Sequence, residues 1–330
     1  MEQEYTLQIE NLRSSFLTDN GEVKAVNEVS INVPKGSIVG IVGESGCGKS
    51  MTARSVMRLL KYPGKIMGGS ILLEGKDLTQ LSEKEMQSVR GGEISMIFQE
   101  PMTSLNPVVK VGKQVSEAAM LHQNISAAEA KELVLEIFRR VGISEAEKRY
   151  ESFPHQLSGG LRQRVMIAMA MICRPKLLIA DEPTTALDVT VEAQILKLMK
   201  QLRDETGMSI IIISHNLGVI AELCDYVYVM YAGRVVEEAD VFTLFESPRH
   251  PYTKGLLNSV SALELEQERL ETIPGSVPNL RRLPAGCAFC ARCAYAMEHC
   301  PEQLPQLQEV SPGHRVRCHL VEGGAANGEE

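Results

Sequence analysis

One stretch, residues 43–50 with the sequence GESGCGKS, constrains the fold of this chain more than any other. Its spacing is G-x-x-x-x-G-K-S, and it lies between the apolar run Ser37–Val42 and helix-compatible sequence from Lys49 to Leu60. Glycines at such positions let the backbone wrap so that successive N–H groups point inward, where they can bind phosphate oxygens. A glycine-rich turn can match this spacing by chance. The strand before it and the helix after it, however, are the context that the phosphate-loop motif requires.

The stretch Leu177–Glu182 is an apolar strand that ends in two carboxylates. In a nucleotide-binding protein, Asp181 at the strand end can hold Mg²⁺ through water, and Glu182 can orient or polarise an attacking water. Alone, Asp-Glu-Pro is a common strand-to-turn ending. Together with the phosphate loop, where Lys49 supplies charge and Ser50 a hydroxyl for Mg²⁺, the hydrolytic interpretation is favoured.

A second anion-binding helix start is predicted at residues 157–164, LSGGLRQR. Ser158 and the glycines at 159 and 160 would leave N–H groups exposed at the positive end of a helix. A capped helix with a flexible entry is the alternative for this segment alone. Because one nucleotide does not need two such helix starts, we expect a dimer in which each nucleotide lies between subunits.

Alternating apolar strands and helices predict an α/β fold with a parallel core sheet, and the helical sequence from about 107 to 149 looks like an insertion into it. After about Phe245 the composition changes, and eight of the fifteen prolines follow. Regular helices are hard to sustain there, so we expect an irregular, cysteine-rich C-terminal appendage. The small and acidic residues 323–330 are expected to be a disordered tail.

Bulk properties exclude some functions. The net charge of −8 argues against binding nucleic acid through a broad positive field, and aromatic residues make up 5%. The opening residues show no pattern of an export signal, so we expect none, and the longest apolar runs are far shorter than the roughly 20 residues of a spanning helix. A membrane role would therefore come through a partner protein.

Five of the eight cysteines crowd into one short stretch near the C-terminus: Cys287, Cys290, Cys293, Cys300 and Cys318. In a chain without an export signal, metal or iron–sulfur ligation is favoured over a disulfide framework. Thiolates suit iron–sulfur clusters and zinc alike, and thiols that bind no metal are a third interpretation. For Cys47, Cys173 and Cys224 we favour an inert role as small packed residues.

These motifs occur in the order found in ABC transporter ATPases, and the chain resembles that family over roughly residues 5–240. Besides the segments described above, the resemblance rests on Gln99, the segment Ala186-Leu187-Asp188 and His215. Residues 100–107 (EPMTSLNP) and 247–257 (SPRHPYTKGLL) further resemble the D-type ATP-binding subunit of oligopeptide and dipeptide importers.

The resemblance implies an ABC ATPase domain at 1–245, with a parallel core sheet, an antiparallel β subdomain and a helical subdomain at about 101–170. Residues 246–330 would form the transporter-type C-terminal region. Glu182, His215 and Gln99 would be catalytic, Ser50, Gln99 and Asp181 would hold Mg²⁺, and Asp188 would communicate across the dimer. The implied ATP-binding residues are Phe16, Gly43, Glu44, Ser45, Gly46, Cys47, Gly48, Lys49, Ser50, Met51, Gln99, Ser158, Gly159, Gly160, Gln163 and His215. By itself Phe16 would be a core or turn aromatic, and His215 an ordinary residue at a strand end.

The resemblance also implies cofactors and partners. Besides ATP and Mg²⁺, the spacing Cys287-x5-Cys293-x6-Cys300-x17-Cys318 resembles the four ligands of a [4Fe–4S] cluster in some members, with Cys290 as an alternative ligand. The expected partners are a second, homologous ATPase subunit, two membrane permease subunits and an extracytoplasmic peptide-binding protein, and no nucleic acid. The chain would lie peripherally on the cytoplasmic face of the cell membrane. The alternatives are another cargo such as nickel, a non-transport ABC ATPase, and a regulatory metal-binding module.

Overall fold

The structure is a computed structural model that describes residues 4–99, 104–185, 187–264 and 273–321. It divides into two compact units. Unit 1 comprises residues 1–7, 33–37 and 77–213, and unit 2 comprises residues 8–32, 38–76 and 214–330. The predictions made for residues 100–103, for Ala186 and for the tail at 323–330 lie outside the described residues.

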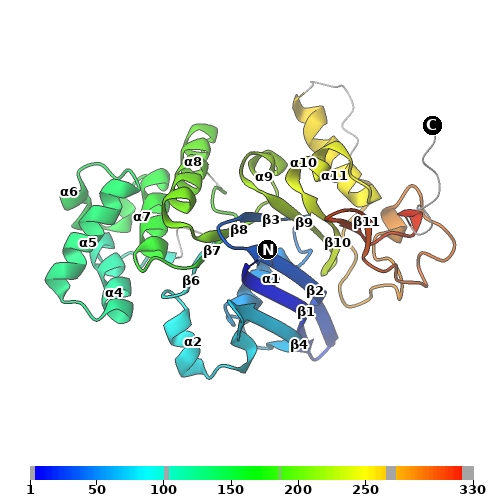
Figure 1. Cartoon of the computed structure of the whole chain (residues 1–330), viewed down its shortest axis with the longest axis horizontal. Helices are drawn as coiled ribbons and strands as arrows, with labels where there is room; N and C mark the ends of the chain where they lie inside the picture. Colours follow the sequence, from blue (N-terminus) through cyan, green and yellow to red (C-terminus); the bar gives the residue numbers. More distant parts are fainter. Residues whose placement is uncertain (1–3, 100–103, 186, 265–272, 322–330) are drawn as a thin grey trace. The chain divides into compact units, whose positions relative to one another are not determined.

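Three parallel strands form the centre of unit 1: β6 (Ile94–Ile97), β7 (Leu177–Asp181) and β8 (Ser209–Ile213). Every residue of β7 and β8 is buried, as expected of parallel strands covered on both faces. The register pairs Asp181 with Ile213, which brings the ends of both strands to one edge. Parallel strands that alternate with helices confirm the predicted α/β class (Figure 1).

Side-chain caps start several helices of unit 1, among them α2, α5, α7 and α8. In α5, Ser126 and Glu129 form a capping box, and the buried face of the helix includes Val134 and Phe138. Helix α5 packs against α4 and α7 within the helical part of the unit (Figure 1, green). The helical segments of unit 1 are η1 (Leu78–Gln80), α2 (Glu83–Val89), α4 (Val111–Gln123), α5 (Ala127–Arg140), α6 (Ala146–Tyr150), η2 (Pro154–Gln156), α7 (Gly159–Met171) and α8 (Val189–Thr206).

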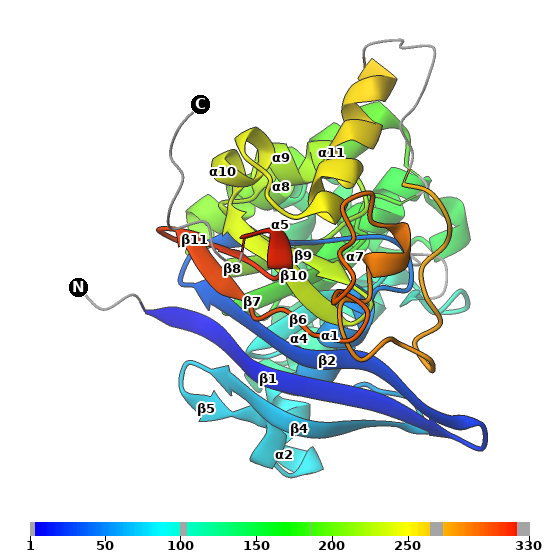
Figure 2. The ribbon, with the colours of Figure 1, turned by 90° about the vertical axis from the view of Figure 1, so that its right-hand side faces the viewer.

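Two sheets organise unit 2. The first has the strand order β2-β1-β4-β5, with β1 (Tyr5–Thr18), β2 (Gly21–Pro34), β4 (Gly64–Leu73) and β5 (Lys76–Asp77). Figure 2 shows β1 and β2 as a long hairpin. In the second, β3 (Ile38–Val42) pairs in parallel with β9 (Tyr226–Tyr231), and β9 pairs antiparallel with β10 (Arg234–Asp240). The helical segments of unit 2 are α1 (Lys49–Val56), α9 (Leu217–Leu223), α10 (Val241–Glu246), α11 (Pro251–Glu264), η3 (Cys290–Arg292) and η4 (His319–Val321).

The C-terminal region is irregular only in its middle. Residues 273–307 contain turns and the short η3, as the prolines predict. By contrast, β12 (His314–Val316) pairs antiparallel with β10, and β11 (Gln308–Ser311) pairs antiparallel with β12. The end of the region thus extends the second sheet of unit 2. Among the described residues, no helix is both long and apolar enough to cross a membrane.

A buried carboxylate on β10 holds this extension in place. Glu237 has no exposed surface and accepts hydrogen bonds from the backbone N–H groups of Arg249 (2.7 Å) and His250 (3.0 Å). Its Oε1 also lies 2.8 Å from Nε2 of His314 on β12. A buried charge is tolerated when it is fully hydrogen-bonded in this way.

We therefore predict that Glu237→Ala lowers the free energy of unfolding by about 3 kcal/mol, because it leaves several buried donors without an acceptor. Urea unfolding followed by circular dichroism measures this. The exposed Glu246→Ala on α10 is the control and should change stability by less than about 0.5 kcal/mol. Equal midpoints for both variants would contradict a structural role for Glu237.

Candidate active site

The glycine-rich loop, residues 43–48, follows the fully buried β3 and leads into α1. Gly43, Gly46 and Gly48 have positive φ angles of 144°, 79° and 108°. A Cβ at Gly43 would lie 2.2 Å from the carbonyl oxygen of Met230, and one at Gly48 would lie 2.4 Å from that of Ala25. Side chains are therefore excluded both by backbone conformation and by the neighbouring strands.

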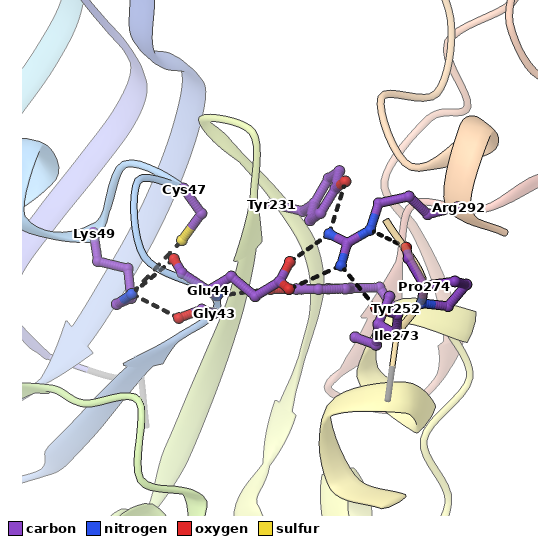
Figure 3. Close-up of polar contacts among 9 residues, drawn as sticks. All are labelled: Gly43, Glu44, Cys47, Lys49, Tyr231, Tyr252, Ile273, Pro274 and Arg292. Atoms are coloured by element: carbon purple, nitrogen blue, oxygen red, sulfur yellow. Dashed lines mark hydrogen bonds and ion pairs between the residues drawn. The ribbon is translucent and has the colours of Figure 1, made fainter. Parts of the chain in front are cut away.

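Lys49 folds back over this loop. Its ammonium donates to the carbonyl oxygens of Gly43 (2.6 Å) and Glu44 (3.1 Å), and the residue is 5% exposed (Figure 3). Ser50 and Met51 follow in the first turn of α1 and are half-buried. The loop thus presents a buried positive charge beside backbone that a polyanion can approach.

The buried thiol of Cys47 lies 3.8 Å from Nζ of Lys49. Burial raises its pKa, and burial also raises the pKa of Cys224 and of the half-buried Cys173. These three thiols therefore stay protonated at neutral pH, as expected of small packed residues.

In unit 1, Gln99 and Glu182 are brought together. The amide Nε2 of Gln99 donates to Oε2 of Glu182 at 2.8 Å, and the hydroxyl of Thr185 donates to the same oxygen at 3.0 Å. Glu182 has a φ of 49°, which is unusual for a residue with a side chain, and its backbone N–H donates to the carbonyl oxygen of Ile213 at 2.8 Å. The neighbouring Asp181, at the end of β7, is 1% exposed.

The start of α7 has the geometry of a capped helix. The hydroxyl of Ser158 accepts a hydrogen bond from the N–H of Leu161 at 3.3 Å, and Ser158 and Gly159 are exposed. A Cβ at Gly160 would lie 2.8 Å from a methyl group of Val191 on α8, which explains why a glycine is needed there. Gln163 is 1% exposed, and neither polar atom of its amide has a hydrogen-bond partner among the described residues.

The remaining predicted residues belong to both units. Asp188 caps α8, its Oδ1 accepting from the N–H of Val191 at 2.9 Å, so it has a local structural role. His215 is exposed in unit 2, just before the N-cap of α9, and Phe16 is half-buried on β1. Unit 2 contains Phe16, the loop and His215, whereas unit 1 contains Gln99, Asp181, Glu182, the α7 start and Asp188.

Two residues that hold the loop were not predicted from the sequence. The hydroxyl of Tyr252 accepts from the N–H of Glu44 at 2.8 Å. The guanidinium of Arg292 forms two hydrogen bonds with the Glu44 carboxylate, at 2.6 and 2.9 Å (Figure 3). Arg292 is 248 residues away in sequence, and its only local signal is a position between two of the clustered cysteines.

All five clustered cysteines line one small cavity in unit 2, the cysteine-lined cavity, together with His250 and Phe289. A backbone hydrogen bond of 2.7 Å from Cys287 to Cys300 brings these two residues together. Burial raises the pKa of Cys287 to about 11. Within the described residues, no three His, Cys, Asp or Glu side chains are placed to hold a metal ion.

His250 presents a buried polar atom at this cavity. Its Nδ1 accepts from the N–H of Tyr252 at 3.0 Å, and Nε2 is buried with no partner among the described residues. Burial lowers the pKa of His250 to about 3, so its ring is neutral at pH 7 and carries its proton on Nε2. His250 therefore has a buried N–H donor without a partner among the described residues.

Two family models match parts of this chain. Residues 26–185 match the family described as ABC transporter, and residues 236–300 match the oligopeptide/dipeptide transporter C-terminal region. Among solved structures, the ATP-binding cassette MJ0796, a dimer bound to ADP and Pi, is similar with a TM-score of 0.65 and 26% identity, covering 71% of this chain and 98% of that chain. The structure of cbiO1 from Clostridium perfringens has a TM-score of 0.65 and 28% identity, and the match covers 80% of this chain and 100% of that chain.

Relatives match over nearly the whole chain. The oligopeptide transport ATP-binding protein OppD of Bacillus subtilis is 53% identical over 96% of this chain and 88% of its own length. OppD of Escherichia coli is 52% identical over 94% of this chain and 92% of its own length. A probable peptide ABC transporter ATP-binding protein of Sinorhizobium fredii is 51% identical over 94% of this chain and 94% of its own length. The chain belongs to the ABC transporter family of ATP-binding proteins, in the group that has the oligopeptide/dipeptide transporter C-terminal region.

Proposed function

We propose that this chain hydrolyses ATP and so powers peptide import as an ATP-binding subunit of a membrane transporter. The observation that carries the ATPase proposal is the glycine-rich loop, with its three left-handed glycines and the buried ammonium of Lys49 folded over it. The peptide cargo is supported by relatives of at least half identity that are named oligopeptide transport proteins.

In the proposed reaction, loop N–H groups and Lys49 bind the phosphates of ATP, with Phe16 against adenine. Lys49 would exchange its hydrogen bonds to carbonyl oxygens for phosphate oxygens. Water attacks the γ-phosphorus, the bond to the β,γ-bridging oxygen breaks, and ADP and phosphate leave. Glu182 takes up or polarises the proton of that water, Gln99 holds the Glu182 carboxylate in place, and His215 contacts the γ-phosphate.

Ser50, Asp181 and Gln99 would hold Mg²⁺, because their side chains offer the hard oxygen ligands that this ion prefers. Asp181 fits this role because it is a buried carboxylate at a strand end. When bound, the ion would neutralise charge that develops on the phosphate oxygens.

The exposed Ser158 and Gly159, with Gly160 and Gln163, would bind the nucleotide of a second, homologous ATPase subunit, and Asp188 would link the two sites. The dimer of the MJ0796 cassette supports this proposal. Two permease subunits and an external peptide-binding protein would complete the transporter, with this chain at the cytoplasmic face of the membrane. The proposed division is an ATPase domain at 1–245, its helical part at about 101–170 and a C-terminal region at 246–330.

We also propose a [4Fe–4S] cluster held by Cys287, Cys293, Cys300 and Cys318, with Cys290 as an alternative ligand. The proposal is supported by the five thiols that line one cavity and by Cys300 Sγ, which accepts a hydrogen bond from the N–H of Met297 at 3.3 Å. Zinc, or thiols without metal, are the alternatives that the test must separate.

The first prediction concerns hydrolysis by the assembled transporter. Glu182→Gln should lower ATP turnover at least about 100-fold while ATP stays bound, because the amide cannot accept the proton of the attacking water. Turnover and retained nucleotide are measured on the same preparation. The exposed Glu222→Gln is the control, and near-normal turnover in Glu182→Gln would refute the catalytic role.

The second prediction concerns the cysteines. Protein purified without oxygen should contain about four iron and about four sulfide ions per chain. Cys293→Ser should lose them, whereas Cys173→Ser, outside the cavity, should keep them. Zinc in place of iron, or no metal in the wild type, would contradict the cluster.

The third prediction concerns cargo and partners. The tagged chain, purified from membranes, should bring down a second ATPase subunit and two permeases, and peptide with its binding protein should raise ATP turnover. Stimulation by nickel and not by peptide would overturn the cargo proposal. Recovery of nucleic acid without permeases would favour a non-transport ATPase.

A further inference from the structure

The side chain of Glu44 leaves the glycine-rich loop on the side away from Lys49 and meets Arg292 (Figure 3). Two parallel hydrogen bonds of 2.6 and 2.9 Å join the guanidinium and the carboxylate. The Arg292 side chain is 6% exposed and that of Glu44 is 28% exposed. A bidentate, partly buried pair of this kind is held far more firmly than a surface ion pair.

Arg292 is itself fixed from several directions. Its Nε donates to the carbonyl oxygen of Pro274 at 2.8 Å, and Nη1 donates to the hydroxyl of Tyr231 at 3.3 Å. The guanidinium also lies 5.9 Å from the ring centres of Tyr231 and Phe289. Because the guanidinium is held by these hydrogen bonds and lies near two aromatic rings, it can hold the Glu44 carboxylate in one place.

The pair matters for a polyanion at the loop. Glu44 is a negative charge within the segment proposed to bind the phosphates of ATP, and an unpaired carboxylate there would repel them. The positive charge of Arg292 offsets the negative charge of this carboxylate, and the two hydrogen bonds hold the carboxylate on the side away from Lys49. In addition, the Tyr252 hydroxyl accepts a hydrogen bond from the backbone N–H of Glu44, so Glu44 is held through both its backbone and its side chain.

Arg292 lies in the chain directly between residues that line the cysteine-lined cavity. It is the last residue of η3, which begins at Cys290, and Cys293 follows it as the C-cap. Phe289, which contacts the guanidinium, lines the same cavity. The packing around the thiols and the position of the guanidinium are therefore set by the same few residues.

We propose that Arg292 is a positioning residue for the glycine-rich loop. Through its bidentate contact with Glu44, the packing of the residues around the cysteine-lined cavity sets the affinity of the loop for ATP. This inference rests on the proposed ATPase function. It adds a regulated contact between the C-terminal region and the loop, formed within unit 2. A purely structural ion pair would instead lower stability when broken and leave ATP affinity unchanged.

The first experiment measures ATP dissociation constants of the full-length chain with a fluorescent ATP analogue, alongside thermal unfolding. Arg292→Met should weaken binding about tenfold, which is about 1.4 kcal/mol, because the Glu44 charge is left unpaired. Arg292→Lys should recover part of the loss. Glu44→Gln combined with Arg292→Met should bind ATP more tightly than Arg292→Met alone, since neither charge remains.

The exposed Arg282→Met, from the same region, is the matched control and should bind ATP as wild type does. If Arg292→Met does not fold, Arg292→Lys decides the question, since it should still bind ATP more weakly than the wild type does. Unchanged affinity in Arg292→Met, or a double variant as weak as the single one, would overturn the proposal. In the assembled transporter, the loss should appear in KM more than in kcat.

The second experiment tests the link to the cavity with Cys318→Ser, since Cys318 lines the cavity but lies outside η3. ATP affinity should fall at least about threefold in the wild-type background and stay unchanged in the background of the double variant. An equal fall in both backgrounds, or no fall in either, would exclude coupling through Arg292. A wild-type chain that neither binds nor hydrolyses ATP would instead refute the proposed function.

Discussion

The glycine-rich loop lies directly against neighbouring backbone, and this close approach constrains much of unit 2. The carbonyl oxygen of Met230 occupies the space that a Cβ of Gly43 would need, and that of Ala25 does the same at Gly48. The loop can adopt its shape only because β9 and β2 run where they do. Strand β9 also contributes Tyr231, which packs against Tyr252 and Phe289 with ring centres 4.6 and 5.2 Å away. The loop and the C-terminal region therefore share one supporting strand.

In unit 1 the comparable constraint is the sharp turn after β7. Glu182 adopts a left-handed backbone conformation, which costs free energy, and its side chain is then held by Gln99 and Thr185. Strain of this kind persists where the surrounding contacts over-determine it. A carboxylate held on a rigid strand end is well suited to act on a water molecule, because little reorganisation is needed during the reaction.

The C-terminal region is more than an appendage to the ATPase. Buried Glu237 ties the segment that begins at Arg249 to β10 and binds His314 on β12. Tyr252 and Arg292, which follow in the same region, form hydrogen bonds with Glu44 in the glycine-rich loop. Residues that sequence comparison assigns to a transporter-specific region thus contact the loop that is common to the wider family.

The sequence by itself determined the local features. The spacing of residues 43–50 predicted the loop, the apolar run ending at Asp181 predicted a buried parallel strand, and the alternation of strands and helices predicted the α/β class. These follow from short-range rules of periodicity and glycine placement, which operate within one element. Only the tertiary structure decided which distant residues meet. Gln99 meets Glu182 across 83 residues, Glu44 meets Arg292 across 248, and β12 joins β10 from beyond a proline-rich stretch. Such contacts depend on strand order and on loop paths, and no local pattern around Glu44 or Arg292 specifies the other.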